Sequence, residues 1–232
     1  MKRVAVLQSS YIPWRGYFDL LASVDEFVFY DDVQYTKQDW RNRNRIKTPQ
    51  GPLWLTIPVG SDLHRKIRQV EIADPAAGRA HWQRLHANYR RAACYGEVAE
   101  WLQALYCEQE WTSLSTVNER LVQAICNQLE IATHLSRSSD YLLEPGRTER
   151  LVSICKQAGA TTYVSGPSAR AYLDVAAFEQ AHIDVSWFDY PIYPEYPQLW
   201  GAYADKLSIL DLLFNCGSQA PRYMKPARLD MP

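Results

Sequence analysis

The chain has 232 residues, of which 47% are apolar and 22% charged, and its 25 lysines and arginines nearly balance 26 aspartates and glutamates. This composition is typical of a soluble globular protein and excludes a disordered, collagen-like or coiled-coil chain. The net charge of −1 gives no overall field that would attract nucleic acid or an anionic membrane. The length fits a single domain, which we place at residues 1–217, followed by a loose tail at 218–232.

The five cysteines are odd in number and form no C-x-x-C pair, so we expect free thiols rather than disulfides or a zinc site. The histidines share no spacing typical of metal ligands, and no motif identifies a cofactor. Apolar runs stay well below the roughly 18 residues of a membrane helix, and no signal peptide is recognisable at the N-terminus. We therefore expect a cytoplasmic chain without membrane insertion.

The first 60 residues predict a strand, a helix, a second strand and a hairpin. Residues 4–7 form an apolar run typical of a buried strand, Pro13 favours the start of a helix, and residues 26–30 form the second strand. This is the minimal crossover of a parallel sheet, in which ligands gather at the carboxyl ends of the strands. Residues 41–59 have the pattern of a β-hairpin with a Pro/Gly turn.

Downstream, apolar residues at helical spacing predict about three helices over 76–130, a segment that could cover the ligand cleft. Strands and helices then alternate, with strands expected at 132–135, 161–164 and 183–188 and helices at 147–158, 169–180 and 205–214. The predicted fold class is α/β, a mainly parallel sheet with an inserted helical segment.

The densest basic stretch of the chain lies in the predicted hairpin. Successive side chains of a strand point to opposite faces. The charged side chains of Arg41, Arg43, Arg45 and Lys47 are therefore expected on one face and the amide side chains of Asn42 and Asn44 on the other. Guanidinium groups match phosphates and carboxylates, so this stretch is a candidate anion site. The alternative, given equal weight, is a solvated edge strand protected by its charge.

Two adjacent carboxylates, Asp31 and Asp32, follow the second predicted strand, and Gln34 lies just beyond them. A carboxylate at this place could act as a general base or hold a divalent cation. Adjacent strand residues point to opposite faces, so at most one of the two is expected to enter the cleft. The alternative is a turn or a helix cap.

The segment from Gln8 to Tyr17 joins a polar loop to the start of a helix, where backbone N–H groups can bind an anion. Tyr11, Trp14 and Tyr17 offer aromatic rings for stacking on a base or a sugar. The alternative, which we weigh more heavily, is that these rings belong to the core.

A second strand, glycine turn and helix at Ser165, Gly166 and Asp174 could contact a phosphate or an acyl group. Ser208 and Asp211 lie beside the apolar stripe of the last predicted helix. They are candidates for substrate binding, and equally for a helix cap and a hydrogen bond within the protein.

Across nearly its whole length the sequence resembles the WbqC-like family. The matching residues are 6–8, 11–14, 16–18, 27–34, 40–47, 54–59, 82, 86, 89, 150–151, 154–155, 165–166, 172–174, 207–211, 215 and 217. Members of this family are found with genes for O-antigen and other surface polysaccharides. The resemblance implies a transferase of lipopolysaccharide or other surface-glycan biosynthesis that acts on a nucleotide-activated or amino sugar. His86 is the one histidine at a position that matches the family, and it is a candidate for acid–base catalysis.

In this hypothesis the enzyme transfers an acyl, aminoacyl or similar group. Arg41, Arg43 and Lys47 would bind phosphates, and Asp31 or Asp32 would act as the base. A non-catalytic binding or scaffold protein of glycan assembly is the alternative from another class. A third hypothesis is a fold similar to HIGH-type nucleotidyltransferases, whose His-x-Gly-His motif would coincide with Trp14 to Tyr17; neither aromatic residue can carry the charge of those histidines.

Overall fold

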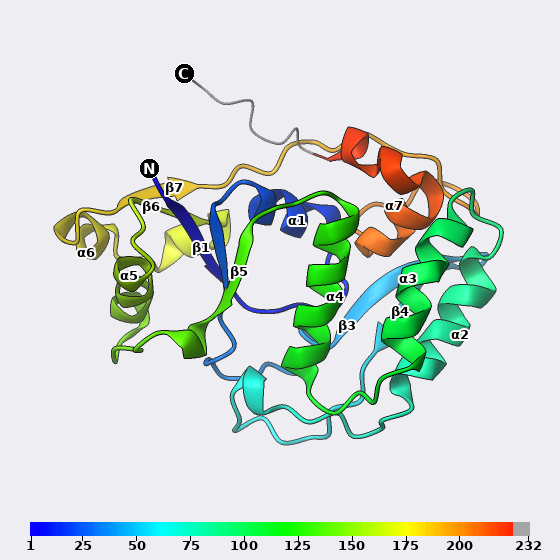
Figure 1. Ribbon diagram of the computed structural model, residues 1–232, viewed down its shortest axis with the longest axis horizontal. Coiled ribbons are helices and arrows are strands. Elements are labelled where there is room, and N and C mark those ends of the chain that lie inside the picture. Colours follow the sequence, from blue (N-terminus) through cyan, green and yellow to red (C-terminus); the bar gives the residue numbers. More distant parts are fainter. Residues whose placement is uncertain (225–232) are drawn as a thin grey trace.

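The computed structural model describes residues 1–224 and is built around a five-stranded parallel sheet (Figure 1). The strands stand in the order β5-β2-β1-β6-β7. They are β1 (Arg3–Leu7), β2 (Glu26–Phe29), β5 (His134–Arg137), β6 (Thr162–Ser165) and β7 (Asp184–Trp187). From β1 the chain builds the sheet outward through β2 to β5, then returns to the other side of β1. The strand order therefore reverses between β1 and β6.

Seven α-helices accompany these strands. They are α1 (Arg15–Ala22), α2 (Ala77–Tyr89), α3 (Tyr95–Cys107), α4 (Leu114–Gln128), α5 (Arg147–Gln157), α6 (Val175–Gln180) and α7 (Ile209–Cys216). Short 3-10 helices are η1 (Ile67–Gln69), η2 (Ser138–Asp140), η3 (Pro167–Ala171) and η4 (Gly217–Tyr223). The predicted α/β class with a parallel sheet is confirmed.

Alternation along the strands gives the sheet two apolar faces. Val4, Val6 and Val28 pack with α5 and α6, whereas Ala5 and Phe27 pack with α1 and α4. Right-handed crossovers explain the two layers, because connections that run in opposite directions along a sheet lie on opposite faces. Figure 1 shows α5 and α6 on one side of the strands and α1 and α4 on the other.

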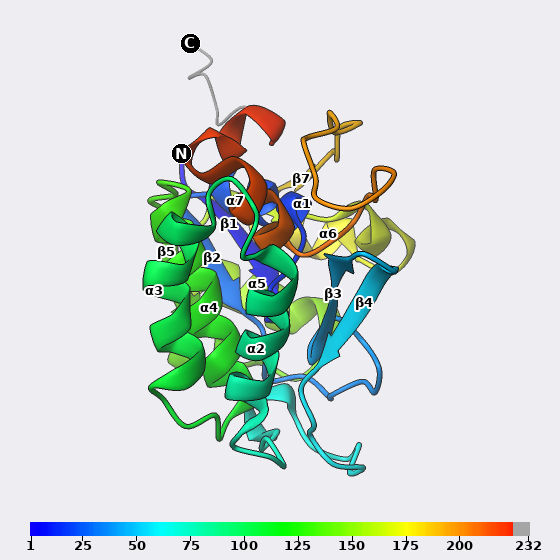
Figure 2. The same ribbon diagram turned by 90° about the vertical axis from the view of Figure 1, so that its right-hand side faces the viewer.

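The predicted hairpin is present as β3 (Arg43–Thr48) and β4 (Gly51–Thr56), which pair with each other and not with the large sheet. Gly51 has φ +103° in its turn, a conformation that suits glycine. Helices α2 and α7 contact β3, and Figure 2 shows the hairpin beside α2. The inserted helices α2, α3 and α4 bury Leu85, Leu102 and Leu121 in the main core.

Two predicted helices differ from those observed. Instead of one helix over 169–180 there are η3 and α6, because Asp174 caps α6 by accepting a hydrogen bond from the Ala176 amide at 3.0 Å. The last helix begins at Ile209 rather than at 205, because Lys206 has φ +55° and Ser208 provides the cap.

The predicted loose tail, 218–232, begins with ordered structure. Residues up to Tyr223 form η4, in which Ala220 is fully buried, and 225–232 lie outside the described residues. The five cysteines all carry free thiols. Over residues 1–224, none of the helices combines the length and apolar character needed to cross a bilayer.

Candidate functional site

A large cavity lies where the strand order reverses. It has a volume of about 770 Å³ and is lined by Leu7 and Gln8 at the end of β1 and by Ser165 and Gly166 at the end of β6. In open α/β sheets ligands bind at this point, outside the carboxyl ends of the strands. The volume is within the range of small-molecule sites. We name this cavity the large compartment.

Two arginines provide all the charge among the described residues that line the large compartment. Arg147 and Arg150 come from the first turn of α5. The Arg147 guanidinium lies 3.7 Å from the centre of the Tyr172 ring. Burial raises the pKa of Tyr30, and the charge and hydrogen bond of Arg150 act in the opposite direction. With no carboxylate among the described residues of its walls, this cavity favours an anionic ligand.

A second cavity of about 250 Å³ adjoins the first and shares Leu7 and Tyr190 with it. We name it the small compartment. Aromatic rings and two cations dominate its walls, which comprise Leu7, Ser10, Pro13, Trp14, Tyr17, Trp40, Arg41, Tyr190 and Lys206. Helices α2, α3 and α4 contribute no residue to either compartment, although α3 and α4 line a separate cavity of about 600 Å³, so the expectation that they cover a ligand cleft stays a prediction.

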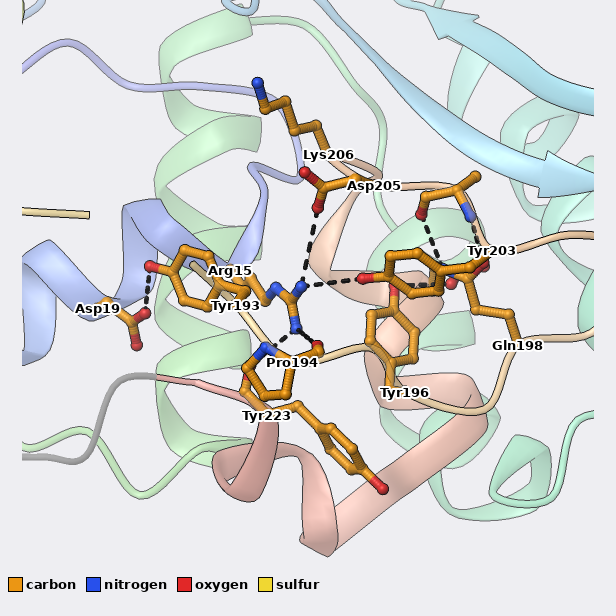
Figure 3. Close-up of polar contacts among 12 residues, drawn as sticks. Arg15, Asp19, Tyr193, Pro194, Tyr196, Gln198, Tyr203, Asp205, Lys206 and Tyr223 are labelled. Carbon is orange, nitrogen blue, oxygen red and sulfur yellow. Dashed lines mark hydrogen bonds and ion pairs between the residues drawn. The ribbon is translucent and has the colours of Figure 1, made fainter. Parts of the chain in front are cut away.

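The segment 190–206 runs along the small compartment, and Arg15 of α1 holds it in place (Figure 3). The guanidinium of Arg15, which is 5% exposed, lies 4.5 Å from the centre of the Tyr193 ring. It donates hydrogen bonds of 2.8–2.9 Å to the carbonyls of Pro194 and Tyr223 and to the hydroxyl of Tyr203. These contacts fix the segment between its two lining residues, Tyr190 and Lys206.

Asp31 braces the loop that follows β1. Its carboxylate accepts hydrogen bonds from the Ser9 amide at 2.9 Å and from the Ser115 hydroxyl, and the residue is 4% exposed. The brace fixes the loop that carries Gln8 and Ser10 to the compartments. Asp31 itself is not among the residues that line them.

Asp32 forms ion pairs with Arg68 at 2.6 Å and Lys66 at 3.2 Å and accepts a hydrogen bond from Ser138. Burial raises the pKa of Asp32, but these three partners outweigh burial and lower it. His86 lies on α2, where its Nδ1 is 2.6 Å from the Tyr95 hydroxyl, and it lines neither compartment. The acid–base roles of Asp31, Asp32 and His86 stay predictions.

The basic residues of the hairpin have three different environments. Arg41 reaches the small compartment, where its Nη1 donates to the Ser10 hydroxyl at 2.7 Å. Arg43 lies over the Trp54 ring at 4.4 Å. Lys47 is 2% exposed and donates to the Gln198 side chain at 2.7 Å and to a backbone carbonyl at 2.6 Å. Only Arg41 of these three therefore lines a described cavity.

Two buried polar networks lie behind the hairpin. Asp211 is fully buried and accepts hydrogen bonds from the hydroxyls of Tyr89 at 2.7 Å and Tyr196 at 2.8 Å. Burial raises the pKa of Asp211, although both tyrosines and the charge of Lys47 act to lower it. A buried carboxylate that depends on these partners is a structural group.

The second network is centred on His81. Its Nε2 lies 3.2 Å from the Thr56 carbonyl, which can only accept, so Nδ1 accepts from the Tyr11 hydroxyl at 2.7 Å. Burial lowers the pKa of His81 to about 4, and the imidazole is neutral at neutral pH. Tyr11, predicted to stack on a ligand, is instead fully buried beside this histidine.

The sequence matches a known protein family over nearly all the residues that line the two compartments. The profile of the WbqC-like protein family matches residues 8–223. The chain belongs to this family. A relative from Mycobacterium tuberculosis, which bears the name uncharacterized protein Rv1507c, is 55% identical over 230 residues, covering 98% of this chain and 100% of the relative. No solved structure gives a significant match.

In this WbqC-like protein the structure gathers some of the predicted site residues and separates others. Those at the compartments are Gln8, Trp14, Tyr17, Gln34, Arg41, Ser165 and Gly166. Those with structural contacts elsewhere are Tyr11, Asp31, Asp32, Asn42, Arg43, Asn44, Lys47, His86, Asp174, Ser208 and Asp211.

Sequence reasoning missed Arg147 and Arg150 as candidate site residues. Two signals pointed to these arginines: their spacing of three at the start of a predicted helix, which places both on one face, and the position of Arg150 among the residues that match the family. That this helix start faces the large compartment depends on the strand order, which is not a local property of the sequence.

Proposed function

We propose that this WbqC-like protein is a transferase that acts on a nucleotide-activated sugar in surface-glycan biosynthesis. The observation that supports the proposal most directly is the pair Arg147 and Arg150 at the reversal of strand order, with no carboxylate on the same walls. A guanidinium group can donate two parallel hydrogen bonds to the oxygens of one phosphate, and the N-terminus of α5 carries a partial positive charge. The phosphates of the ligand would lie against this helix start.

The rest of the large compartment fits the other parts of such a ligand. Tyr30, Tyr172 and Tyr190 line it and provide rings for a base or a sugar. If a phosphate leaves during transfer, fixed guanidiniums stabilise the charge that develops on it. If the activated amino sugar instead accepts an acyl or aminoacyl group, the same contacts hold its phosphates while its amine reacts.

A second candidate function is binding of a nucleotide sugar without turnover, as in a scaffold of a glycan-assembly complex. It is favoured by the absence of carboxylate, histidine and cysteine side chains from the described walls of both compartments. Such side chains are the usual general acids, bases and nucleophiles.

Calorimetric titration tests the shared element of both candidates, an anionic nucleotide in the large compartment. The ligands are sugars activated by uridine, guanosine or thymidine diphosphate, and we expect at least one of them to bind about 100-fold more tightly than the corresponding nucleoside. This factor follows because each charged hydrogen bond to the phosphates contributes about 1.5–3 kcal/mol. Arg150→Ala should weaken that binding about tenfold or more. Arg84→Ala, which removes an exposed arginine of α2, is the matched control.

Mass spectrometry then separates the two functions. The protein is incubated with the bound nucleotide sugar and with acyl-CoA, ATP and amino acids, and a new mass on the sugar supports the transferase. Tight binding without any mass change supports the second candidate. Nucleosides that bind as tightly as nucleotide sugars, or the same affinity in Arg150→Ala, would contradict both.

A further inference from the structure

The small compartment differs from the large one in its chemistry. Four of its nine lining residues are aromatic, namely Trp14, Tyr17, Trp40 and Tyr190, and Leu7 and Pro13 add further apolar surface. Its volume, about 250 Å³, is about a third of that of the large compartment. A compact ligand with an apolar or ring-shaped body fits such walls better than a second nucleotide does.

Arg41 places a partly satisfied cation in this aromatic cavity. Its side chain is 14% exposed, and its Nη1 donates to the Ser10 hydroxyl at 2.7 Å. Asp39 is the nearest carboxylate, at 3.7 Å from Nη2, but it does not line the cavity. Nε of Arg41 is buried and has no hydrogen-bond partner within residues 1–224. Nη1 also lies 3.4 Å from the Ser9 carbonyl, whereas Nη2 makes no hydrogen bond within residues 1–224 and therefore retains donor capacity.

Lys206 is the second cation. Its side chain is exposed, and no partner of its ammonium group is recorded in the described part of the chain. Figure 3 shows this side chain extending away from Arg15 and Asp205. Arg41 and Lys206 are far apart in the sequence and line one cavity, whose walls carry no acidic residue within 1–224.

Two of the six non-glycine residues with positive φ among residues 1–224 lie at or beside this cavity. Ile12, between the lining residues Ser10 and Pro13, has φ +36° although it is β-branched and fully buried, and Lys206 has φ +55°. Each such conformation costs about 1–3 kcal/mol and persists only where contacts enforce it. Here the carbonyl of Ile12 accepts from Asn44 at 2.9 Å, and that of Lys206 accepts from Arg45 at 3.2 Å. Strained residues of this kind cluster at ligand sites.

We propose that the small compartment binds a second substrate, a compact organic acid whose carboxylate lies between Arg41 and Lys206 and whose body lies among the aromatic rings. The shared walls Leu7 and Tyr190 would place this acid beside a ligand of the large compartment. Its role as a second substrate rests on the proposed function, whereas the binding site does not. The carboxylate can belong to a sugar acid, an aromatic acid or a short aliphatic acid.

Three matched pairs of probes distinguish these sources, each an acid and its uncharged counterpart: glucuronate and glucose, benzoate and benzyl alcohol, 3-hydroxybutyrate and 1,3-butanediol. Binding to the full chain without nucleotide is measured by ligand-observed NMR titration. We expect the acid of at least one pair to bind about tenfold more tightly than its counterpart, which corresponds to about 1.4 kcal/mol.

Two variants locate the acid. Arg41→Gln should abolish the preference for the acid, and Lys206→Gln should reduce it about threefold, as expected for a more exposed cation. Lys206→Gln also serves as a variant that should fold normally, because the Lys206 side chain is exposed and its ammonium group has no partner among residues 1–224. Lys156→Gln, an exposed site on α5, is the matched control and should change nothing.

Three results would overturn the inference: no acid binds, acids and counterparts bind equally, or Lys206→Gln and a folded Arg41→Gln both keep the full preference. If nucleotide sugars bind and acids do not, only this inference fails. If acids bind with the expected preference and nucleotide sugars do not, the site stands and the proposed function fails.

Discussion

The start of α5 and the strand β3 are both rich in basic residues, but their side chains have different environments in the folded protein. Lys47 and Arg43 of β3 contact a backbone carbonyl, an amide side chain and an indole ring of the protein itself. Arg147 and Arg150 lie at the open end of the sheet and line a cavity. The density of basic residues in a sequence therefore does not show which of them keep free hydrogen-bond donors after folding. An anion can bind only to basic side chains whose hydrogen-bond donors are still free after the chain has folded.

The difference has a geometric cause. The strand β3 lies beneath the segment 190–206 and beside α7, so its long side chains are covered by backbone and aromatic groups. The start of α5 faces the gap left where the strand order reverses. A cation in the first place stabilises the fold, and a cation in the second is available to a ligand.

The strongest test is Lys47→Ala. We expect it to lower the free energy of unfolding by about 4 kcal/mol, because it removes two charged hydrogen bonds of about 1.5–3 kcal/mol each, to Gln198 and to a backbone carbonyl. Nucleotide-sugar binding by the remaining folded protein should be unchanged. Denaturant unfolding measures the first effect, and the exposed Lys37→Ala is the control, expected within about 0.5 kcal/mol of the wild type. A stable Lys47→Ala protein with weak nucleotide binding would restore Lys47 as a ligand residue.

The next effect concerns pH and His81, which lies behind the hairpin. Its pKa is lowered to about 4 in the folded chain, so protonation favours the unfolded state. The free energy of unfolding should therefore fall by about 3 kcal/mol from this group as the pH decreases from about 6.5 to 4. Stability curves of the wild type and His81→Gln measure this difference. Gln83→Ala, at an exposed site on the same helix, is the control and should keep the wild-type slope, whereas an unchanged slope in His81→Gln would contradict the prediction.

A smaller effect compares two arginines that both lie over an aromatic ring. Arg147→Ala should weaken nucleotide-sugar binding about tenfold, whereas Arg43→Ala should leave it unchanged. The first guanidinium lies 3.7 Å from the centre of a ring beside the large compartment, and the second lies 4.4 Å from that of Trp54. Equal losses in the two variants would show that the hairpin also contacts the nucleotide.

The smallest effect is the stability of Arg43→Ala. A cation over an exposed ring contributes about 0.5–1 kcal/mol, and Trp54 is 38% exposed. We expect a loss in that range by denaturant unfolding, with Arg84→Ala as the control. A loss above about 2 kcal/mol would indicate that Arg43 shares the buried role of Lys47.

The periodicity of the sequence determined most of the fold. Buried runs of β2 and β6, the helical spacing in the inserted segment and the Pro/Gly turn of the hairpin are local patterns, and local patterns set secondary structure and its order. Family membership also follows from the sequence, because matching residues extend from 8 to 223. The break between η3 and α6 was missed, because it depends on a single cap at Asp174.

Only the tertiary structure decided which polar residues remain free to contact a ligand. The sequence singled out Arg43, Lys47 and Tyr11 for the site, but non-local contacts with Trp54, Gln198 and His81 engage them. Strand order is likewise non-local, and it turned the start of α5 toward the ends of β1 and β6. Charge and aromatic content are properties of residues, whereas exposure and free hydrogen-bonding capacity arise only when distant segments pack together.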